Sequence, residues 1–340
     1  MILVVVLIAC GSPVPAPQAR GEDRTAPPPT NERELAFGSH RACTRTSSGG
    51  VACWTIGDQA GASFAERVPG LDHVRSVAMS GNTLLATRDH GELWRWDGSP
   101  PVAIAQAIKA VDVAGGIACT IDRQGKVECW GEAGQEIVGS PPNAPAFVDV
   151  RVGPPAACGM TSAGDIWCWE WRWKYLDQWL PSEPTRVPLV HPATTLAVAD
   201  GRTCAGTDGG VECWGSPMTN DPASEGCRGY AELHNNPYPS TRWRDCPVHR
   251  LAGLSDVTAL TIAGREVIAT THGGSVVAWL DGRVTPLLGA TGLRGIAART
   301  VATGLEVCGR STANLLACVL DPPPPPPPPT PPGSWSVRIP

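Results

Sequence analysis

Thirteen cysteines are the residues whose type and spacing point most directly to chemistry. Ten of them form five pairs that are nine or ten positions apart: Cys43 with Cys53, Cys119 with Cys129, Cys158 with Cys168, Cys204 with Cys213, and Cys308 with Cys318. Cysteine at this frequency is typical of exported proteins, in which neighbouring thiols oxidise to disulfides. Zinc ligands commonly follow a Cys-x-x-Cys step, and the sequence has none. The spacing therefore predicts five disulfides in an oxidising compartment.

Two further cysteines, Cys227 and Cys246, predict a sixth disulfide. The alternative is a zinc ion bound by these two residues with His234 and His249, because Cys246 and His249 are separated by the short step that is common among zinc ligands. We expect the disulfide and no bound metal.

The sequence contains no familiar catalytic motif. It has no Gly-x-Ser-x-Gly, no His-Glu-x-x-His and no phosphate-binding loop. Asp122, Asp165 and Asp208 recur in predicted turns, where Asp stabilises the local backbone. We therefore expect no catalytic residues and no cofactor. The alternative is an enzyme, a hydrolase or lyase, with its site at the mouth of the fold.

Aromatic residues are the best candidates for ligand binding. Trp occurs 13 times, against three Tyr and three Phe. Along residues 167–174 every second residue is Trp, which places these side chains on one face of a strand. Rigid aromatic side chains are good anchors because they lose little entropy on binding. The predicted ligand-binding residues are Trp171, Trp173, Tyr175, Trp179, Tyr230, Tyr238 and Trp243; the alternative is that they only cover two long loops.

The cysteine pairs belong to a repeated hairpin. Each pair encloses a turn with β-prone residues on both sides, which predicts two antiparallel strands. Residues 85–96 and 268–279 match this pattern with Leu85 and Arg95, or Ile268 and Ala278, in the cysteine positions. In every copy both cysteines are present or both are absent, as expected for facing positions.

Seven copies of this hairpin predict the architecture. A β-like segment precedes most copies, so each repeat of roughly 35–45 residues supplies about four short strands. Such units form a radial array of small sheets. We therefore predict an all-β fold, a seven-bladed β-propeller with disulfide-bonded hairpins. A recurring Trp is expected to pack each blade on its neighbour, at Trp54, Trp96, Trp130, Trp169, Trp214 and Trp279.

The repeats resemble those of the regulator of chromosome condensation family. His40 with Cys43, the Gly-Lys-Val-Glu-Cys-Trp-Gly motif at 125–131 and the Gly-Val-Glu-Cys-Trp-Gly motif at 210–215 carry the resemblance, which covers residues 35–320. It implies a seven-bladed propeller. The eukaryotic founder of the family is an exchange factor for a small GTPase and binds chromatin, whereas secreted bacterial relatives are often binding or inhibitory proteins. Guanine-nucleotide exchange is therefore a second alternative, although the cysteine content argues against a reducing compartment.

Composition narrows the range of partners. The formal net charge is −5 and charged residues make up 17% of the chain, so no basic field would attract nucleic acid or an anionic membrane surface. The 38 Gly and 35 Pro residues disfavour helices. We expect a monomer that binds no nucleic acid.

The first ten residues resemble a bacterial lipoprotein signal. An apolar run over residues 2–9 is too short to span a bilayer, which takes about 20 helical residues. It ends at Cys10-Gly11, and Cys10 is the predicted lipidation site, although no Lys or Arg precedes the run. We predict a lipid-anchored protein of the bacterial cell envelope, at the outer membrane or cell surface, whose only membrane contact is the anchor.

The predicted organisation ends in a ring-closing strand. Glu66–Pro69 and Thr185–Pro188 are predicted to join repeats, and repeat 1 has no such segment before it; the chain ends in the similar Ser-Val-Arg-Ile-Pro. We predict that this end closes the ring after a stiff polyproline bridge. The predicted segments are 1–10, lipoprotein signal; 11–33, flexible Pro-rich tether; 34–320, propeller; 321–333, polyproline spacer; and 334–340, ring-closing strand.

The connections after repeats 4 and 5 are the longest, and both carry the aromatic candidates. Because equivalent repeat positions open onto the same side of a ring, these loops are predicted to lie side by side. The predicted function is that of a non-enzymatic binding or scaffold propeller that recognises a protein or glycan through this surface.

Overall fold

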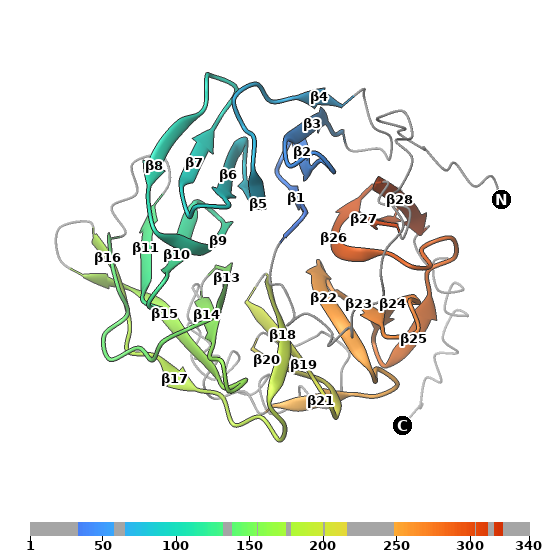
Figure 1. Ribbon diagram of the computed structural model, residues 1–340. Helices are drawn as coiled ribbons and strands as arrows, with labels where there is room; N and C mark the ends of the chain where they lie inside the picture. The colour runs from blue at the N-terminus through green and yellow to red at the C-terminus, as the bar shows by residue number, and fades with distance from the viewer. Residues whose placement is uncertain are drawn as a thin grey trace, which may run out of the picture.

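The protein folds as a ring of seven antiparallel sheets, the blades, around a central channel (Figure 1). This computed structural model describes residues 33–57, 65–131, 138–154, 156–174, 178–199, 201–215, 248–302, 304–311 and 316–321. These residues form strands and turns, and none of them forms a helix. In the described part of the chain no helix could therefore cross a membrane. The prediction of an all-β, seven-bladed propeller is confirmed.

The strands follow one another in chain order, and each blade runs from an inner strand at the channel to an outer strand at the rim. Blades 1 to 3 comprise β1 (Leu35–Phe37), β2 (Arg41–Arg45), β3 (Val51–Thr55) and β4 (Glu66–Arg67); β5 (Val74–Ser80), β6 (Thr83–Arg88), β7 (Leu93–Trp96) and β8 (Val102–Ala105); and β9 (Ile108–Ala114), β10 (Ile117–Asp122), β11 (Val127–Gly131) and β12 (Val138–Gly139).

Blade 4 has five strands, and blade 7 has three among the described residues. Blades 4 to 7 comprise β13 (Asp149–Gly153), β14 (Ala156–Met160), β15 (Ile166–Lys174), β16 (Gln178–Pro181) and β17 (Thr185–Arg186); β18 (Ala193–Ala199), β19 (Arg202–Thr207), β20 (Gly210–Gly215) and β21 (His249–Leu251); β22 (Val257–Ala263), β23 (Glu266–Thr271), β24 (Val276–Leu280) and β25 (Arg283–Pro286); and β26 (Arg294–Val301), β27 (Gly304–Arg310) and β28 (Leu316–Asp321).

Five disulfides join the second and third strands of their blades, as predicted. The bonded pairs are Cys43–Cys53, Cys119–Cys129, Cys158–Cys168, Cys204–Cys213 and Cys308–Cys318. Each pair is directly opposed in the register, with Cα atoms 4.0–4.1 Å apart. This is the close spacing of a non-hydrogen-bonded antiparallel pair, in which side chains touch. The sixth predicted pair, Cys227 with Cys246, lies outside the described residues.

The two hairpins without cysteines keep the same register. Leu85 lies opposite Arg95 in blade 2, and Ile268 lies opposite Ala278 in blade 6. The prediction that these residues occupy the cysteine positions is therefore confirmed. A disulfide is one of several ways to fill this facing pair.

The recurring Trp packs between blades. Trp214 of blade 5 is buried in a core cluster that includes Cys158 and Cys168 of blade 4, and Trp279 of blade 6 is buried with Cys204 and Cys213 of blade 5. Trp54 of blade 1 shares a cluster with Cys308 of blade 7 across the seam of the ring. The aromatic side chain of one blade therefore covers the disulfide of the blade before it, which explains why both residues recur.

Glycine turns connect successive blades through the backbone. The carbonyl of Gly125, in the turn between β10 and β11, accepts the N–H of Phe147 at 2.8 Å, and the carbonyl of Gly164 accepts that of Ala193 at 2.9 Å. Gly125 has a φ of 86°, and a Cβ there would lie 2.9 Å from the Cβ of Ala146. The recurring Gly is therefore required both for the turn and for close approach of the next blade.

The seam between blades 7 and 1 is closed by side chains in the described part of the chain. Arg310 contacts the Glu34 carboxylate at 3.0 Å, and Arg299 donates to the carbonyl of Gly57 at 2.8 Å. The segments predicted to join repeats have another role: Glu66–Arg67 and Thr185–Arg186 are the outer strands of blades 1 and 4. The chain end, residues 334–340, lies outside the described residues.

Candidate functional site

Strand β15 is longer than its partner β14, and the end of β15 that extends past β14 forms a hairpin with β16. Residues Ile166 to Glu170 pair with β14, whereas Trp171 to Lys174 pair with β16. Alternating Trp residues favour such an extended strand because large side chains fit a pleated surface. The hairpin lies at the rim of the ring (Figure 1), where β16 contacts β12 of blade 3.

The base of this hairpin is fixed by polar contacts. The backbone N–H of Glu170 donates to Ser182 Oγ at 3.1 Å, and the N–H of Ser182 donates to the carbonyl of Glu170 at 2.8 Å. Asn143 Nδ2, in the connection from blade 3, donates to Glu183 Oε1 at 3.0 Å. The hairpin is thus held to blades 3 and 4 at the point where it leaves the sheet.

Trp171 is part of the core. Its side chain is only 8% exposed and belongs to the cluster between blades 3 and 4, together with Trp169 and Phe147. The Trp169 and Phe147 rings stack with centroids 5.8 Å apart. Trp171 therefore packs between blades 3 and 4 and is not part of the exposed surface of the hairpin.

Trp173 and Trp179 come together near the tip of the hairpin. Their Cα positions are directly opposed in the register of β15 and β16. Tyr175 lies outside the described residues. The backbone thus places two of the predicted residues, six positions apart in the sequence, opposite each other.

The second insertion begins and ends on blade 5. Strand β20 ends at Gly215 and β21 begins at His249, with Cys213 opposite His249. The segment between them includes Tyr230, Tyr238, Trp243, Cys227 and Cys246, all of which lie outside the described residues. Of the alternative zinc ligands, only His249 is described.

Both insertions leave the same face of the ring. Gly215 lies opposite Arg202, and Glu170 lies opposite Ala156, each beside the turn that follows the inner strand of its blade. We call this the insertion face, defined by residues 172–174 and 178–181, Gly215 and His249. Blades 4 and 5 are neighbours (Figure 1), which agrees with the expected common side.

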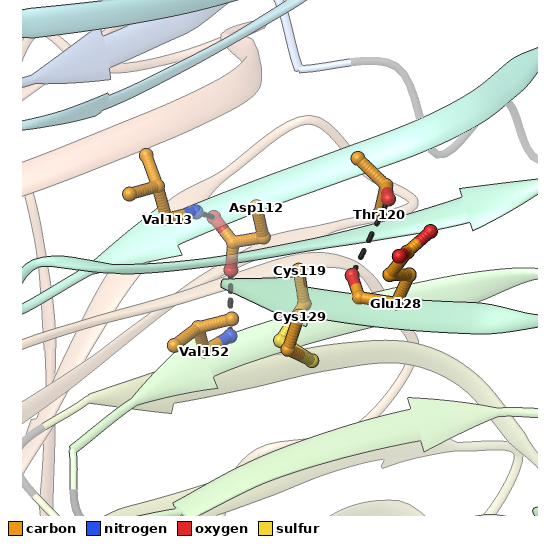
Figure 2. Close-up of a disulfide and its surroundings, with 7 residues drawn as sticks. All are labelled: Asp112, Val113, Cys119, Thr120, Glu128, Cys129 and Val152. Carbon is orange, nitrogen blue, oxygen red and sulfur yellow. Dashed lines mark hydrogen bonds between the residues drawn. A yellow bond between two sulfur atoms is a disulfide. The ribbon is translucent and has the colours of Figure 1, made fainter. Parts of the chain in front are cut away.

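The central channel contains a second group of functional side chains, which the sequence analysis missed. Asp112 of β9 accepts backbone N–H groups from Val113 and Val152, both at 2.8 Å (Figure 2). Its carboxylate also accepts two hydrogen bonds from the Arg33 guanidinium. Asp112 therefore connects the inner strands of blades 3 and 4 to the entry of the chain into blade 1.

A second buried pair adjoins this cluster. Arg151 contacts the Asp149 carboxylate at 2.9 Å, and its Nε donates to the carbonyl of Leu196 in blade 5 at 3.0 Å. Burial raises the pKa of the Asp149 carboxyl above its ordinary value, and the guanidinium groups of Arg151 and Arg33 oppose the shift. The signal for this cluster is in the sequence, because Asp112, Asp149 and Arg151 interrupt otherwise apolar inner strands.

The channel also holds a cavity of about 960 Å³, which is where an enzyme site at the ring mouth would lie. Its ionisable lining includes Arg33, Asp112, Arg151, Asp256 and His272. Each of these groups is already paired: His272 Nδ1 lies 2.9 Å from the Asp256 carboxylate, and the other three belong to the cluster above. The contacts of Arg33, Asp112 and Arg151 join different blades, whereas the exposed His272–Asp256 pair lies within blade 6.

In the part of the chain that the structure describes, Glu306, Cys308 and Cys318 form a cluster of metal-ligand types. The two sulfur atoms are bonded to each other. A disulfide sulfur is not the thiolate that metals require, so these residues do not form a metal site.

Comparison with known proteins shows similarity to solved propeller structures. No protein-family model matches the chain, and no curated protein sequence matches it. Solved structures with a similar fold include Prp20p from Saccharomyces cerevisiae, which has 12% sequence identity and a TM-score of 0.58 over 84% of this chain and 81% of that chain. That protein was studied for its binding to Gsp1p and histones.

Two other propellers are similar at the same level. The WD40 ectodomain of the receptor kinase ACR4 from Arabidopsis thaliana has 15% identity and a TM-score of 0.54, over 84% of this chain and 94% of that chain. Human WBSCR16 has 15% identity and a TM-score of 0.53, over 77% and 81%. At these identities the likeness concerns the fold alone.

Proposed function

We propose that this protein is a binding propeller of the bacterial cell envelope, which recognises a protein or glycan through the insertion face. The observation that carries the proposal is the β15–β16 hairpin, which extends beyond its blade and opposes Trp173 to Trp179. The fold supports a binding or scaffold role, because a ring of rigid blades presents loops without itself needing to move. Aromatic residues on a fixed hairpin suit recognition, since little entropy is lost when they bind.

The proposed location rests on the disulfides and on the first residues of the chain. Five bonded pairs require an oxidising compartment, which the bacterial envelope provides. We propose lipidation at Cys10 as the means of anchoring. Replacing Cys10 with Ala is expected to release a folded protein from membranes; retention on membranes after a high-salt wash would contradict the anchor.

The binding proposal is tested by a pull-down from envelope extract. Wild-type protein is compared with a Trp173→Ala/Trp179→Ala variant, and bound components are identified by mass spectrometry. The matched control is Val190→Ala, because Val190 is 78% exposed and lies in the connection between blades 4 and 5 on the opposite face. We expect a component that wild type and the control retain and the double variant loses. Equal capture by all three proteins would contradict recognition through the hairpin.

The exchange-factor alternative has its own assay. Release of labelled guanine nucleotide from a panel of bacterial small GTPases would favour it. A turnover screen with hydrolase and lyase substrates tests the enzyme alternative in the same way.

A further inference from the structure

Blade 7 has an open edge in the described part of the chain. It has three strands, and β28 is the outermost of them. Cys318 and Cys308 form a non-hydrogen-bonded pair, with Cα atoms 4.0 Å apart. In such a pair the backbone N–H and C=O groups of each residue point away from the partner strand. The N–H and C=O groups of Leu316, Cys318 and Leu320 therefore point outward, where a fourth strand would bind.

The side chains of β28 are also less covered than their counterparts. Val51, Ile166 and Val211 stand two positions before the second cysteine in blades 1, 4 and 5, and each is fully buried. Leu316 holds the same position in blade 7 and is only partly buried. Cys318 is likewise only partly buried, whereas the other nine described disulfide cysteines are buried. Among the described residues, no apolar side chain covers this edge as in blades 1, 4 and 5.

In blades 1, 4 and 5 that cover is a short outer strand with a shared sequence. Glu66, Thr185 and His249 each lie opposite the second cysteine, and an Arg and then an apolar residue follow each of them. The apolar residues are Val68, Val187 and Leu251, which are buried in the same clusters as Val51, Ile166 and Val211. The Arg67 and Arg186 side chains are exposed at the rim.

The backbone contact of this strand is also shared. The N–H of Val68 donates to the carbonyl of Val51 at 2.9 Å, and the N–H of Val187 donates to that of Ile166 at 2.8 Å. Each bond therefore joins the apolar residue of the outer strand to the residue two positions before the cysteine.

The chain ends in Val337-Arg338-Ile339-Pro340, which repeats Glu-Arg-Val-Pro of blade 1 and Thr-Arg-Val-Pro of blade 4. We propose that this segment is the outer strand of blade 7, with Val337 opposite Cys318 and Ile339 covering Leu316. The N–H of Ile339 then donates to the carbonyl of Leu316, and Arg338 lies at the rim. The last residues thus complete the last blade, instead of adding a strand before the first one.

In this arrangement the polyproline run is no longer a bridge between blades 7 and 1. Residues 322–332 become the connection between the third and fourth strands of blade 7. The insertions of blades 4 and 5 occupy the same position in their own blades. The run is therefore a loop held at both ends on the insertion face, where it adds a third long connection to that surface.

Hydrogen exchange of the intact protein tests the proposal without any substitution. We expect the amides of Cys318 and Ile339 to exchange at least tenfold more slowly than in an unstructured peptide. Exchange of residues 334–340 at the unstructured rate would overturn the proposal.

Two variants separate pairing from general stability. Ile339→Asp is expected to remove protection from the outward-facing Cys318 amide of β28 and leave blades 3 to 5 protected, whereas the matched control Arg338→Ala keeps protection throughout. In a chain that ends at Pro332, a synthetic peptide of residues 333–340 is expected to restore protection of β28. Protection of β28 that is unchanged in Ile339→Asp would contradict the register. A dimer by light scattering, with protection lost on dilution, would show that the segment pairs with a second copy and would overturn pairing within one chain.

Discussion

The Arg33 guanidinium and the Asp112 carboxylate form a two-bond ion pair inside the channel, although the residues are 79 positions apart in the chain. The Arg33 carbonyl also accepts the N–H of Val77 in blade 2 at 2.9 Å. Arg33 therefore fixes the start of the propeller to blades 2 and 3.

We predict that Asp112→Ala lowers the free energy of unfolding by about 3 kcal/mol, because it leaves a partly buried guanidinium and two backbone N–H groups without their acceptor. The control is Arg67→Ala, which breaks the exposed pair with Asp72 and is expected to cost no more than about 0.5 kcal/mol. Urea unfolding of both variants measures the difference. Equal losses would show that the channel pair contributes no more than a surface pair.

The disulfides are predicted to stabilise each blade separately. Removing one pair, as in Cys119→Ala/Cys129→Ala, is expected to cost about 3 kcal/mol, since the bond closes a short loop in the unfolded chain. Non-reducing peptide mapping is expected to recover each of the five described pairs and also Cys227–Cys246. Bonds between blades would contradict the hairpin register.

Gly125 is predicted to be required for contact between blades 3 and 4. Gly125→Ala places a Cβ near Ala146 and the backbone of Phe147, in addition to the strain of a positive φ. Gly70→Ala has the same kind of φ, 80°, with nothing within 4 Å of the new Cβ, so it measures the strain alone, about 1 kcal/mol. A larger loss at Gly125 by thermal unfolding confirms the contact; equal losses would assign the effect to backbone strain.

Glu266 is predicted to make stability depend on pH. Burial, and then the Asp321 carboxylate, raise the pKa of Glu266, so the folded state binds this proton more tightly than the unfolded state does. The contribution of Glu266 to stability is therefore most favourable at acidic pH and is lost as the pH rises from the ordinary pKa of Glu through the raised one.

Glu266→Gln is expected to raise the Tm at pH 7 and to change it little at pH 4. The pKa of Glu92 is shifted in the opposite direction, because hydrogen bonds from Trp94 and Arg88 lower it. Glu92→Gln is therefore expected to lower the Tm at pH 7. A Tm gain for Glu266→Gln that is the same at both pH values would exclude ionisation as its cause.

The repeat architecture could be predicted because facing residues constrain one another. The cysteine pairs, and the Leu85–Arg95 and Ile268–Ala278 substitutions, mark the register of each hairpin in the sequence itself. The recurring Trp beside them marks the contact between blades. Local patterns of this kind can be recognised in one sequence without an alignment.

The site was harder to predict because it depends on neighbours in space. Trp171 and Trp173 share the same alternation, but Trp171 is buried by residues of blade 3, about 25–50 positions earlier, which no period in β15 reveals. The outer strands Glu66–Arg67 and Thr185–Arg186 are too short to show a period. Asp112 and Arg33 come into contact only in the folded ring, because they are 79 positions apart in the chain.

Photo-crosslinking in cells tests recognition through the insertion face most directly. The crosslinker p-benzoylphenylalanine replaces Trp173 in one protein and the exposed Leu288 of the opposite face in another. We predict that the protein with the crosslinker at position 173 gives a discrete crosslinked species, and that the protein with the crosslinker at position 288 does not. Crosslinking at Leu288 alone, or at neither position, would contradict the claim that this propeller binds its partner through the β15–β16 hairpin.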